Sequence, residues 1–296
     1  MDLSVVVPVY FNAETLEETH RRTRVDLAAR FPDLAVEFVF VDDASGDASF
    51  ERLLDLAGRF PGVTVVKLAR NFGQPRASLA GFAEARGRFA ARIAADLQEP
   101  ASLVGDLYAA VLASGARAAI AEREARDEGA WRRWTSLVFY TLLGAAAFRG
   151  MPRSGFDCML MAEPVYRALH EDAPPVFLQG ALLSRVPDPA RVRYSRLSRA
   201  RGRSRWTLRK KLSFFRDAFV GYTRIPQAIL GVSALAFVAA LLGAWIRGSW
   251  ALWAAALLAA ASAGAQWRVL SKRGRGREPL FVVEKVVRSP DHVHAG

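Results

Sequence analysis

The sequence predicts an α/β protein with a mostly parallel sheet, helices on both faces of that sheet, and a C-terminal hairpin of two membrane-spanning helices. In the first 125 residues, short β-rich runs alternate with helical stretches. This alternation is typical of a parallel sheet whose strands are joined by crossover helices. In the last third of the chain, two long apolar runs follow each other closely. The 296 residues are enough to bury a hydrophobic core.

Five strands and four helices are expected before residue 125. The β-rich runs are Leu3–Val9, Val36–Val41, Val63–Leu68, Phe89–Ala94 and Ala116–Ala121. The helical stretches between them are Glu14–Arg30, Ser49–Arg59, Pro75–Arg86 and Ser102–Ser114. In a parallel α/β sheet, ligands bind beyond the carboxyl ends of the strands. The residues that directly follow each strand are therefore the candidates for a site.

Two acidic residues and an aromatic residue follow the first two predicted strands. Tyr10 comes after the first strand, and Asp42 and Asp43 come after the second. A carboxylate accepts hydrogen bonds from a nucleobase N–H or a ribose hydroxyl, and a tyrosine ring stacks on a base. The alternative is local, because Asp42, Asp43 and Ser45 also suit a helix cap and a turn.

Asp96 and Gln98 follow the fourth predicted strand, two positions apart at a chain reversal. Two oxygen-bearing side chains at this spacing can reach one hard cation. Mg²⁺ or Mn²⁺ would complete its coordination shell with diphosphate oxygens and water. The alternative for Asp96 is a helix N-cap.

The two apolar runs are residues 225–246 and 250–265, and about 20 helical residues cross a bilayer core. Basic residues flank their outer ends, whereas the connection carries only Arg247, so both termini are expected in the cytoplasm. A soluble helical hairpin is the alternative. An anionic membrane accounts for the net charge of +12, and no nucleic-acid motif is present. The single cysteine, Cys158, excludes an intrachain disulfide and suits a reducing cytoplasm.

Four motifs carry a resemblance to a known family: VPVYFNAETL, FVFVDDASGD, LARNFGQPRASLAGFAEARG and AADLQEP, in this order. Together they resemble the GT-A family-2 glycosyltransferases, and more narrowly the polyprenyl-phosphate glycosyltransferases. The likeness extends over nearly the whole chain, through the runs GFDCML, FLQG, RARGRSR and REPLFVV. It implies a GT-A, Rossmann-like fold and an inverting glycosyltransferase. The donor would be a UDP- or GDP-linked sugar, and the acceptor a polyprenyl phosphate such as undecaprenyl phosphate, at the cytoplasmic face of the inner membrane.

The resemblance also implies roles for individual residues. Mg²⁺ or Mn²⁺ would be held by Asp96 and Gln98, and Arg123 would lie near the donor phosphates, which makes these three the catalytic set. The nucleotide-sugar would contact Pro8, Tyr10, Asn12, Asp42, Asp43 and Asp96. The lipid phosphate would contact Arg132, Ser136, Arg199, Ser204 and Arg205. Some relatives are tetramers, so a homo-oligomer is a further expectation.

The chain is expected to divide into four parts. These are a nucleotide-sugar-binding core (1–127), an acceptor-side part with interfacial helices (128–224), the membrane hairpin (225–270) and a cytoplasmic tail (271–296). Within the second part, the tryptophans and arginines of residues 131–144 suit a helix that lies in the membrane interface. A buried core helix is the alternative for that segment.

Three residues depart from the family pattern. Ala94 replaces the first aspartate of the acidic pair, so Asp96 is the only carboxylate left and Glu99 is a candidate to complete the metal site. Asn12 stands where better-known members have Glu, and Arg205 where they have Lys. Two other functions are therefore alternatives to the main expectation. One is a membrane glycosyltransferase with a glycan or another lipid acceptor, and the other is a catalytically inactive membrane scaffold.

Overall fold

The computed structural model describes residues 1–124, 141, 150–152, 155–169, 177–197, 225–247, 257–264 and 281–289. Contacts divide the chain into two compact units. The first comprises Met1–Gly144, Phe148–Trp206 and Pro279–Gly296, and it contains the sheet. The second comprises Ala145–Ala147 and Thr207–Glu278. The four-part division and the interfacial helix at 131–144 stay predictions, since nearly all of that helix lies outside the described residues.

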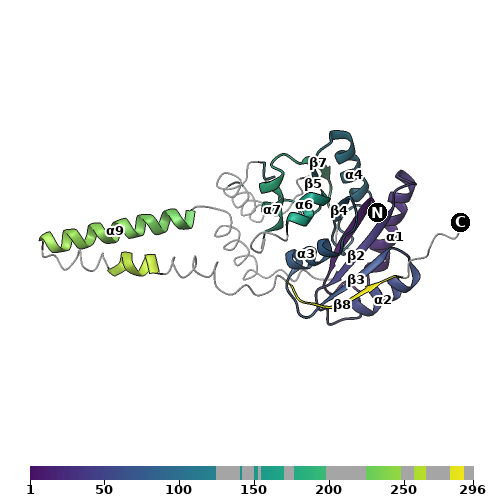
Figure 1. Ribbon diagram of the computed structural model, residues 1–296, viewed down its shortest axis with the longest axis horizontal. Helices are drawn as coiled ribbons and strands as arrows, with labels where there is room; N and C mark the ends of the chain where they lie inside the picture. Colours follow the sequence, from purple (N-terminus) through teal and green to yellow (C-terminus); the bar gives the residue numbers. More distant parts are fainter. Residues whose placement is uncertain are drawn as a thin grey trace. The chain divides into compact units, whose positions relative to one another are not determined.

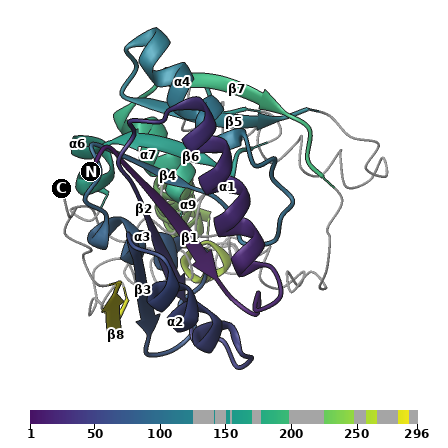
Figure 2. The same cartoon turned by 90° about the vertical axis from the view of Figure 1, so that its right-hand side faces the viewer.

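The first unit is built on one eight-stranded sheet in the order β7-β5-β6-β4-β1-β2-β3-β8 (Figure 1). Figure 2 shows this order from β7 at the top to β8 at the bottom. The strands are β1 (Leu3–Val9), β2 (Val36–Asp42), β3 (Val63–Leu68), β4 (Phe89–Arg92), β5 (Ala118–Arg123), β6 (Met159–Ala162), β7 (Ala190–Tyr194) and β8 (Val283–Arg288). Only β6 and β8 run antiparallel to their neighbours. The predicted mostly parallel sheet is confirmed, and the five predicted strands correspond to β1–β5.

Helices cover both faces of the sheet. They are α1 (Leu16–Arg30), α2 (Ser49–Arg59), α3 (Gln74–Glu84), α4 (Leu103–Ser114), α6 (Glu163–Ala168) and α7 (Leu178–Arg185). The helices α1, α2 and α4 pack Leu16, Leu53 and Leu107 into one core with Val5 and Val7 of β1. Strand side chains alternate between faces, so Val6, which lies between these two valines, points to the other side.

The opposite face of β1 is covered by α3, which Figure 1 shows on the other side of the sheet from α1 and α2. The helix approaches the sheet closely at Gly81. A Cβ atom at Gly81 would lie 2.3 Å from Cγ1 of Val6, so a larger residue would push the helix away. This packing fixes the position of the β3–α3 loop, which precedes α3.

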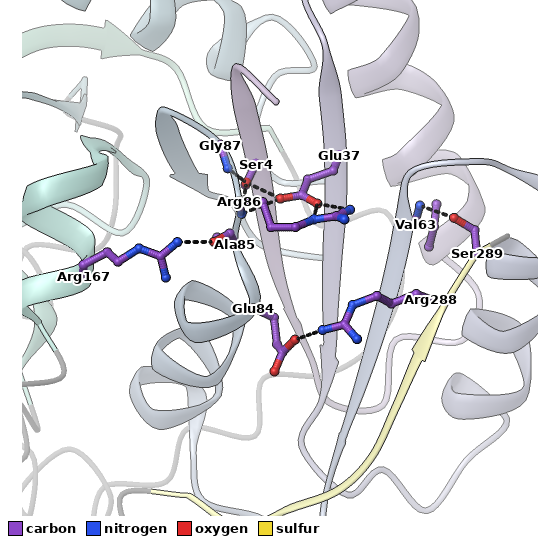
Figure 3. Close-up of polar contacts among 10 residues, drawn as sticks. All are labelled: Ser4, Glu37, Val63, Glu84, Ala85, Arg86, Gly87, Arg167, Arg288 and Ser289. Atoms are coloured by element: carbon purple, nitrogen blue, oxygen red, sulfur yellow. Dashed lines mark hydrogen bonds and ion pairs between the residues drawn. The ribbon is translucent and has the colours of Figure 1, made fainter. Parts of the chain in front are cut away.

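The strand β8 comes from the segment expected to be a tail, and it pairs with the edge of β3. Lys67 on β3 forms an ion pair with Glu284 at 3.0 Å. Arg288 pairs with Glu84 at 2.5 Å, and the backbone N–H of Val63 donates to Oγ of Ser289 at 3.1 Å (Figure 3). This strand was not expected, because its six residues mix charged and apolar side chains at a sheet edge.

The second unit contains α9 (Ile225–Arg247), which coincides with the first apolar run, and residues 257–264 are helical within the second run. Within the part of the chain that the structure describes, no helix has the length and apolarity needed to cross a membrane. The spanning hairpin is therefore not confirmed and stays a prediction.

A buried carboxylate ties the amino ends of β1 and β2 to the connection between α3 and β4 (Figure 3). Glu37 is fully buried, and its Oε1 accepts hydrogen bonds from Ser4 Oγ and from the backbone N–H of Arg86, both at 2.6 Å. Its Oε2 accepts from the Arg86 guanidinium at 2.7 and 2.8 Å. The Ser4 hydroxyl also accepts from the N–H of Gly87 at 2.8 Å. Both oxygens of Glu37 are thus satisfied by groups from neighbouring elements.

Replacing Arg86 by Ala should destabilise the sheet, because it removes the cation from a carboxylate that stays buried. We expect the free energy of unfolding to fall by about 2 kcal/mol, the scale of a lost hydrogen bond to a charged group. Thermal unfolding of the purified protein measures this. The control is Arg88→Ala, which removes the same charge from an exposed position nearby. Equal destabilisation by the two substitutions would contradict the assigned role of the Glu37 network.

Candidate functional site

Strained backbone marks the carboxyl edge of the sheet. Among the described residues, three that are not glycine have positive φ angles: Phe11 (58°), Ala44 (54°) and Leu97 (58°). They follow β1, β2 and β4, which are neighbours in the sheet. This backbone conformation costs about 1 kcal/mol or more for such residues, and it collects at binding and catalytic sites. The predicted site residues after these strands are therefore held in one strained cluster of loops.

The loops that follow β1 and β2 hold each other through side-chain hydroxyls. Ser45 Oγ accepts a hydrogen bond from the backbone N–H of Phe11 at 3.1 Å, and Ser49 Oγ accepts from that of Asn12 at 3.0 Å. The Asn12 side chain turns back on its own loop, where its Oδ1 accepts from the N–H of Tyr10 at 3.1 Å. The Tyr10 ring is partly buried and packs edge-on against Phe11.

Asp42 is a buried carboxylate with one hydrogen-bonding site left over. It is fully buried, and its Oδ1 accepts from the backbone N–H of Ser45 at 3.2 Å. Its Oδ2 is buried and has no hydrogen-bond partner among the described residues. Burial raises the pKa of the Asp42 carboxyl, and the hydrogen bonds from Ser45 only partly oppose that shift. A ligand N–H or O–H at Oδ2 would satisfy this atom.

Asp43 instead organises the loop between β3 and α3. Its Oδ1 accepts from the backbone N–H of Phe72 at 2.7 Å, and its Oδ2 accepts from that of Gly73 at 2.9 Å. The side-chain amide of Asn71 donates to the same Oδ2 at 2.9 Å. Pro8 lies inside β1, buried opposite Val41. The structure therefore shows Asp43 holding the β3–α3 loop and Pro8 buried within β1, and their contact with a nucleoside stays a prediction.

Asp96 and Gln98 are brought together on one cation, the guanidinium of Arg196. Gln98 Oε1 accepts from Arg196 Nη2 at 2.5 Å, and Asp96 Oδ2 lies 4.0 Å from the same nitrogen. Leu97 between them has a left-handed backbone conformation, and the Gln98 N–H donates to Asp96 Oδ1 at 3.2 Å. The two predicted ligand oxygens thus face a single positively charged position.

Glu99 points elsewhere. Its Oε2 accepts from the backbone N–H of Ala94 at 2.7 Å, and its carboxylate also faces the buried thiol of Cys158. Burial raises the pKa of that thiol well above its ordinary value. In the part of the chain that the structure describes, no group of three or more His, Cys, Asp or Glu side chains is arranged to hold a metal ion. Asp96 and Gln98 are the predicted ligands whose oxygens converge on one position at this edge.

Arg123 ends β5 and is held by two residues that were not among the expected site residues. It forms an ion pair with Asp157, and its Nε donates to the Tyr194 hydroxyl at 3.3 Å. Burial raises the pKa of Tyr194 to about 12, so its hydroxyl stays protonated at neutral pH. Asp157 lies within the GFDCML run that carried the resemblance, which was a signal for it. Tyr194 and Arg196 carried no such signal.

The predicted lipid-phosphate residues cannot be placed in this geometry. Arg132, Ser136, Arg199, Ser204 and Arg205 all lie outside the described residues. Their assignment stays a prediction.

Comparisons with known proteins identify the family of this chain. The model of glycosyl transferase family 2 matches residues 4–169. Undecaprenyl-phosphate 4-deoxy-4-formamido-L-arabinose transferase of Pseudomonas paraeruginosa is 32% identical over 242 residues, which cover 78% of this chain and 68% of the relative. The protein of the same name from Pseudomonas savastanoi is 31% identical over 249 residues, with coverages of 81% and 71%.

Among solved structures, the chain is similar to glucosyl-3-phosphoglycerate synthase from Mycobacterium tuberculosis, determined in complex with Mn²⁺, UDP and glucosyl-3-phosphoglycerate. The TM-score is 0.52 at 19% sequence identity, and the match covers 74% of this chain and 77% of that chain. Likeness at this identity shows the fold alone. It confirms the expected GT-A arrangement of the α/β unit.

The Asp42 carboxylate should lower the stability of the ligand-free protein at neutral pH. Because its pKa is raised on folding, the folded state binds more protons than the unfolded state between the two pKa values. Stability therefore falls as pH rises through that window and stays lower above it. Asp42→Asn removes this loss and should raise the melting temperature at pH 7.

Thermal unfolding at several pH values tests this expectation. The exposed Asp33, changed to Asn, is the control for losing a carboxylate. A melting temperature of Asp42→Asn below that of the unmodified protein at neutral pH would show that the carboxylate stabilises the ligand-free fold.

Proposed function

The chain belongs to glycosyltransferase family 2, and we propose that it transfers a sugar from a nucleotide-sugar to undecaprenyl phosphate. The observation that carries the acceptor is the identity, close to one third over most of the chain, with transferases named for undecaprenyl phosphate. The arrangement of Asp42, Asp96 and Arg123 at the carboxyl edge of the sheet supports a donor site there.

The donor nucleoside would bind above β1 and β2. The free Oδ2 of Asp42 suits a base N–H or a ribose hydroxyl, and the Tyr10 ring suits stacking on the base. Asp43 would support the nucleoside site by holding the β3–α3 loop, and Pro8 by its place in β1. Asn12 would support it by closing the loop after β1. The UDP bound by the mycobacterial synthase supports a uridine nucleotide.

A divalent cation, Mg²⁺ or Mn²⁺, would be held by Asp96 Oδ2 and Gln98 Oε1. The residues fit such an ion, because their oxygens already converge on one positive group. A cation bound there would supply positive charge to the diphosphate leaving group. Ala94 contributes no ligand, and the Glu99 carboxylate accepts a hydrogen bond from the backbone N–H of Ala94.

The transfer would be a single displacement with inversion at the anomeric carbon. A phosphate monoester has a second pKa of about 6, so the acceptor oxygen is largely ionised at neutral pH and needs no general base. Arg123, held at the edge by Asp157 and Tyr194, would position and neutralise the donor phosphates. Arg132, Ser136, Arg199, Ser204 and Arg205 are proposed to bind the lipid phosphate.

The reaction would take place at the cytoplasmic face of a membrane, and the second unit would anchor the protein in that membrane. Its helix α9 exposes large apolar side chains, and so do residues 257–264. These exposed residues are Val232, Leu235, Val238, Leu242, Ile246, Leu257 and Leu258. Side chains of this kind suit a lipid environment, and the basic residues outside both runs suit a hairpin with cytoplasmic ends.

Asp96→Asn should lower sugar transfer by about a hundredfold or more, because a key ligand and the only carboxylate of the pair are lost. The assay follows radiolabel from UDP- and GDP-sugars into the organic phase, with and without undecaprenyl phosphate and Mg²⁺ or Mn²⁺. The exposed Asp188, changed to Asn, is the control and should keep full activity.

Three outcomes of this assay bear on the proposal. Transfer that depends on both lipid and cation supports it and identifies the sugar. Donor turnover that ignores added undecaprenyl phosphate favours a glycan or another lipid as acceptor. An absence of both turnover and donor binding favours an inactive scaffold and makes Ala94 the cause to examine.

Charges on α9 should weaken membrane retention. Leu235 and Leu242 are 72% and 56% exposed, and an arginine near the middle of a spanning helix costs about 2.5–3.5 kcal/mol. The double substitution of both by Arg should therefore move protein from the membrane pellet to the soluble fraction. The matched control places Arg at Val25 and Leu112, which are exposed on the first unit. Equal fractionation of the two variants would argue against α9 as the anchor.

A further inference from the structure

The guanidinium of Arg196 lies beside both oxygens that are proposed to hold the cation. It follows β7 by two residues, yet its Nη2 donates to Gln98 Oε1 at 2.5 Å and lies 4.0 Å from Asp96 Oδ2. The next residue, Leu197, donates its backbone N–H to the carbonyl oxygen of Gln98 at 2.9 Å. The segment after β7 is therefore attached to the 96–98 loop by one side chain and one backbone hydrogen bond.

The contacts of Arg196 are incomplete. Its Nε is buried without a hydrogen-bond partner among the described residues, although the side chain as a whole is 27% exposed. A buried N–H without an acceptor costs free energy, so this position of the guanidinium is compensated only in part. Ala94 supplies no carboxylate, so Asp96 is the acidic residue of the 94–96 run that faces Arg196.

We propose that Arg196 and the divalent cation are alternative occupants of the site formed by Asp96 and Gln98, an inference that rests on the proposed metal-dependent function. Two positive charges at these distances from the same oxygens repel each other, so binding of the cation displaces the guanidinium. Displacement also breaks the side-chain hydrogen bond that attaches the segment after β7 to the 96–98 loop. Arg196 is thus a positioning residue that sets cation affinity and couples it to the segment after β7.

Competition of this kind predicts that removing the arginine tightens cation binding. The test is the fraction of free Mn²⁺ measured by electron paramagnetic resonance, with the full purified chain in detergent and no nucleotide present. Arg196→Ala should bind Mn²⁺ about fivefold more tightly, the scale of one partly exposed ion pair. Arg196→Lys keeps a competing charge and should stay close to the unmodified protein.

Two further variants make the result specific. Arg193→Ala removes an equal charge from an exposed position on β7 and should leave Mn²⁺ affinity unchanged. Arg196→Gln keeps a hydrogen-bond donor without the charge and should also bind more tightly, which covers a failure of the alanine variant to fold. Thermal unfolding confirms that each variant is folded.

The possible failures are distinguishable. If the unmodified protein binds Mn²⁺ and neither Arg196→Ala nor Arg196→Gln binds it more tightly, competition is wrong and the proposed function stands. Weaker binding by both variants would mean that Arg196 instead holds the two ligands in place. If neither the unmodified protein nor any variant binds Mn²⁺, the metal role of Asp96 and Gln98 fails, and this inference fails with it.

Discussion

The buried carboxylate of Glu37 is the interaction on which the arrangement of the sheet depends. A charge removed from water must find partners in the protein, and Glu37 finds them on β1 and on the connection between α3 and β4. Strands β1, β2 and β4 are therefore held together at their amino ends, without any contribution from the loops of the site. Because these strands are parallel, fixing one end also fixes where the other ends emerge.

The two edges of the sheet differ in how completely their polar groups are satisfied. At the amino edge, both oxygens of Glu37 accept hydrogen bonds. At the carboxyl edge, Asp42 keeps a buried oxygen with no partner among the described residues, and Arg196 keeps a buried N–H in the same state. Three strained residues follow the strands at that edge as well. The amino edge is thus held by satisfied hydrogen bonds. The unpartnered groups lie at the carboxyl edge, where a ligand would bind them.

Much of this architecture was predictable because it depends on local patterns. Periodicity located β1–β5 and α1–α4, and the rule for strand ends pointed to Asp42 and Asp96. The missing parts depend on contacts distant in sequence. Arg196 meets Gln98 across 98 positions, and β8 pairs with a strand more than 200 residues earlier. The nucleoside contact of Asp43 stays a prediction, and no residue pattern reveals its hydrogen bonds with the backbone N–H groups of the β3–α3 loop.

The strand β8 constrains how the chain relates to any lipid bilayer. Residues 283–288 lie in the same sheet as β1–β3, although the two apolar runs stand between them in the sequence. A sheet lies on one side of a membrane, so the path from residue 225 to residue 278 must begin and end on that side. Any crossings of a bilayer along this path would therefore be even in number. A path that crossed a bilayer once would be incompatible with the pairing of β8 with β3.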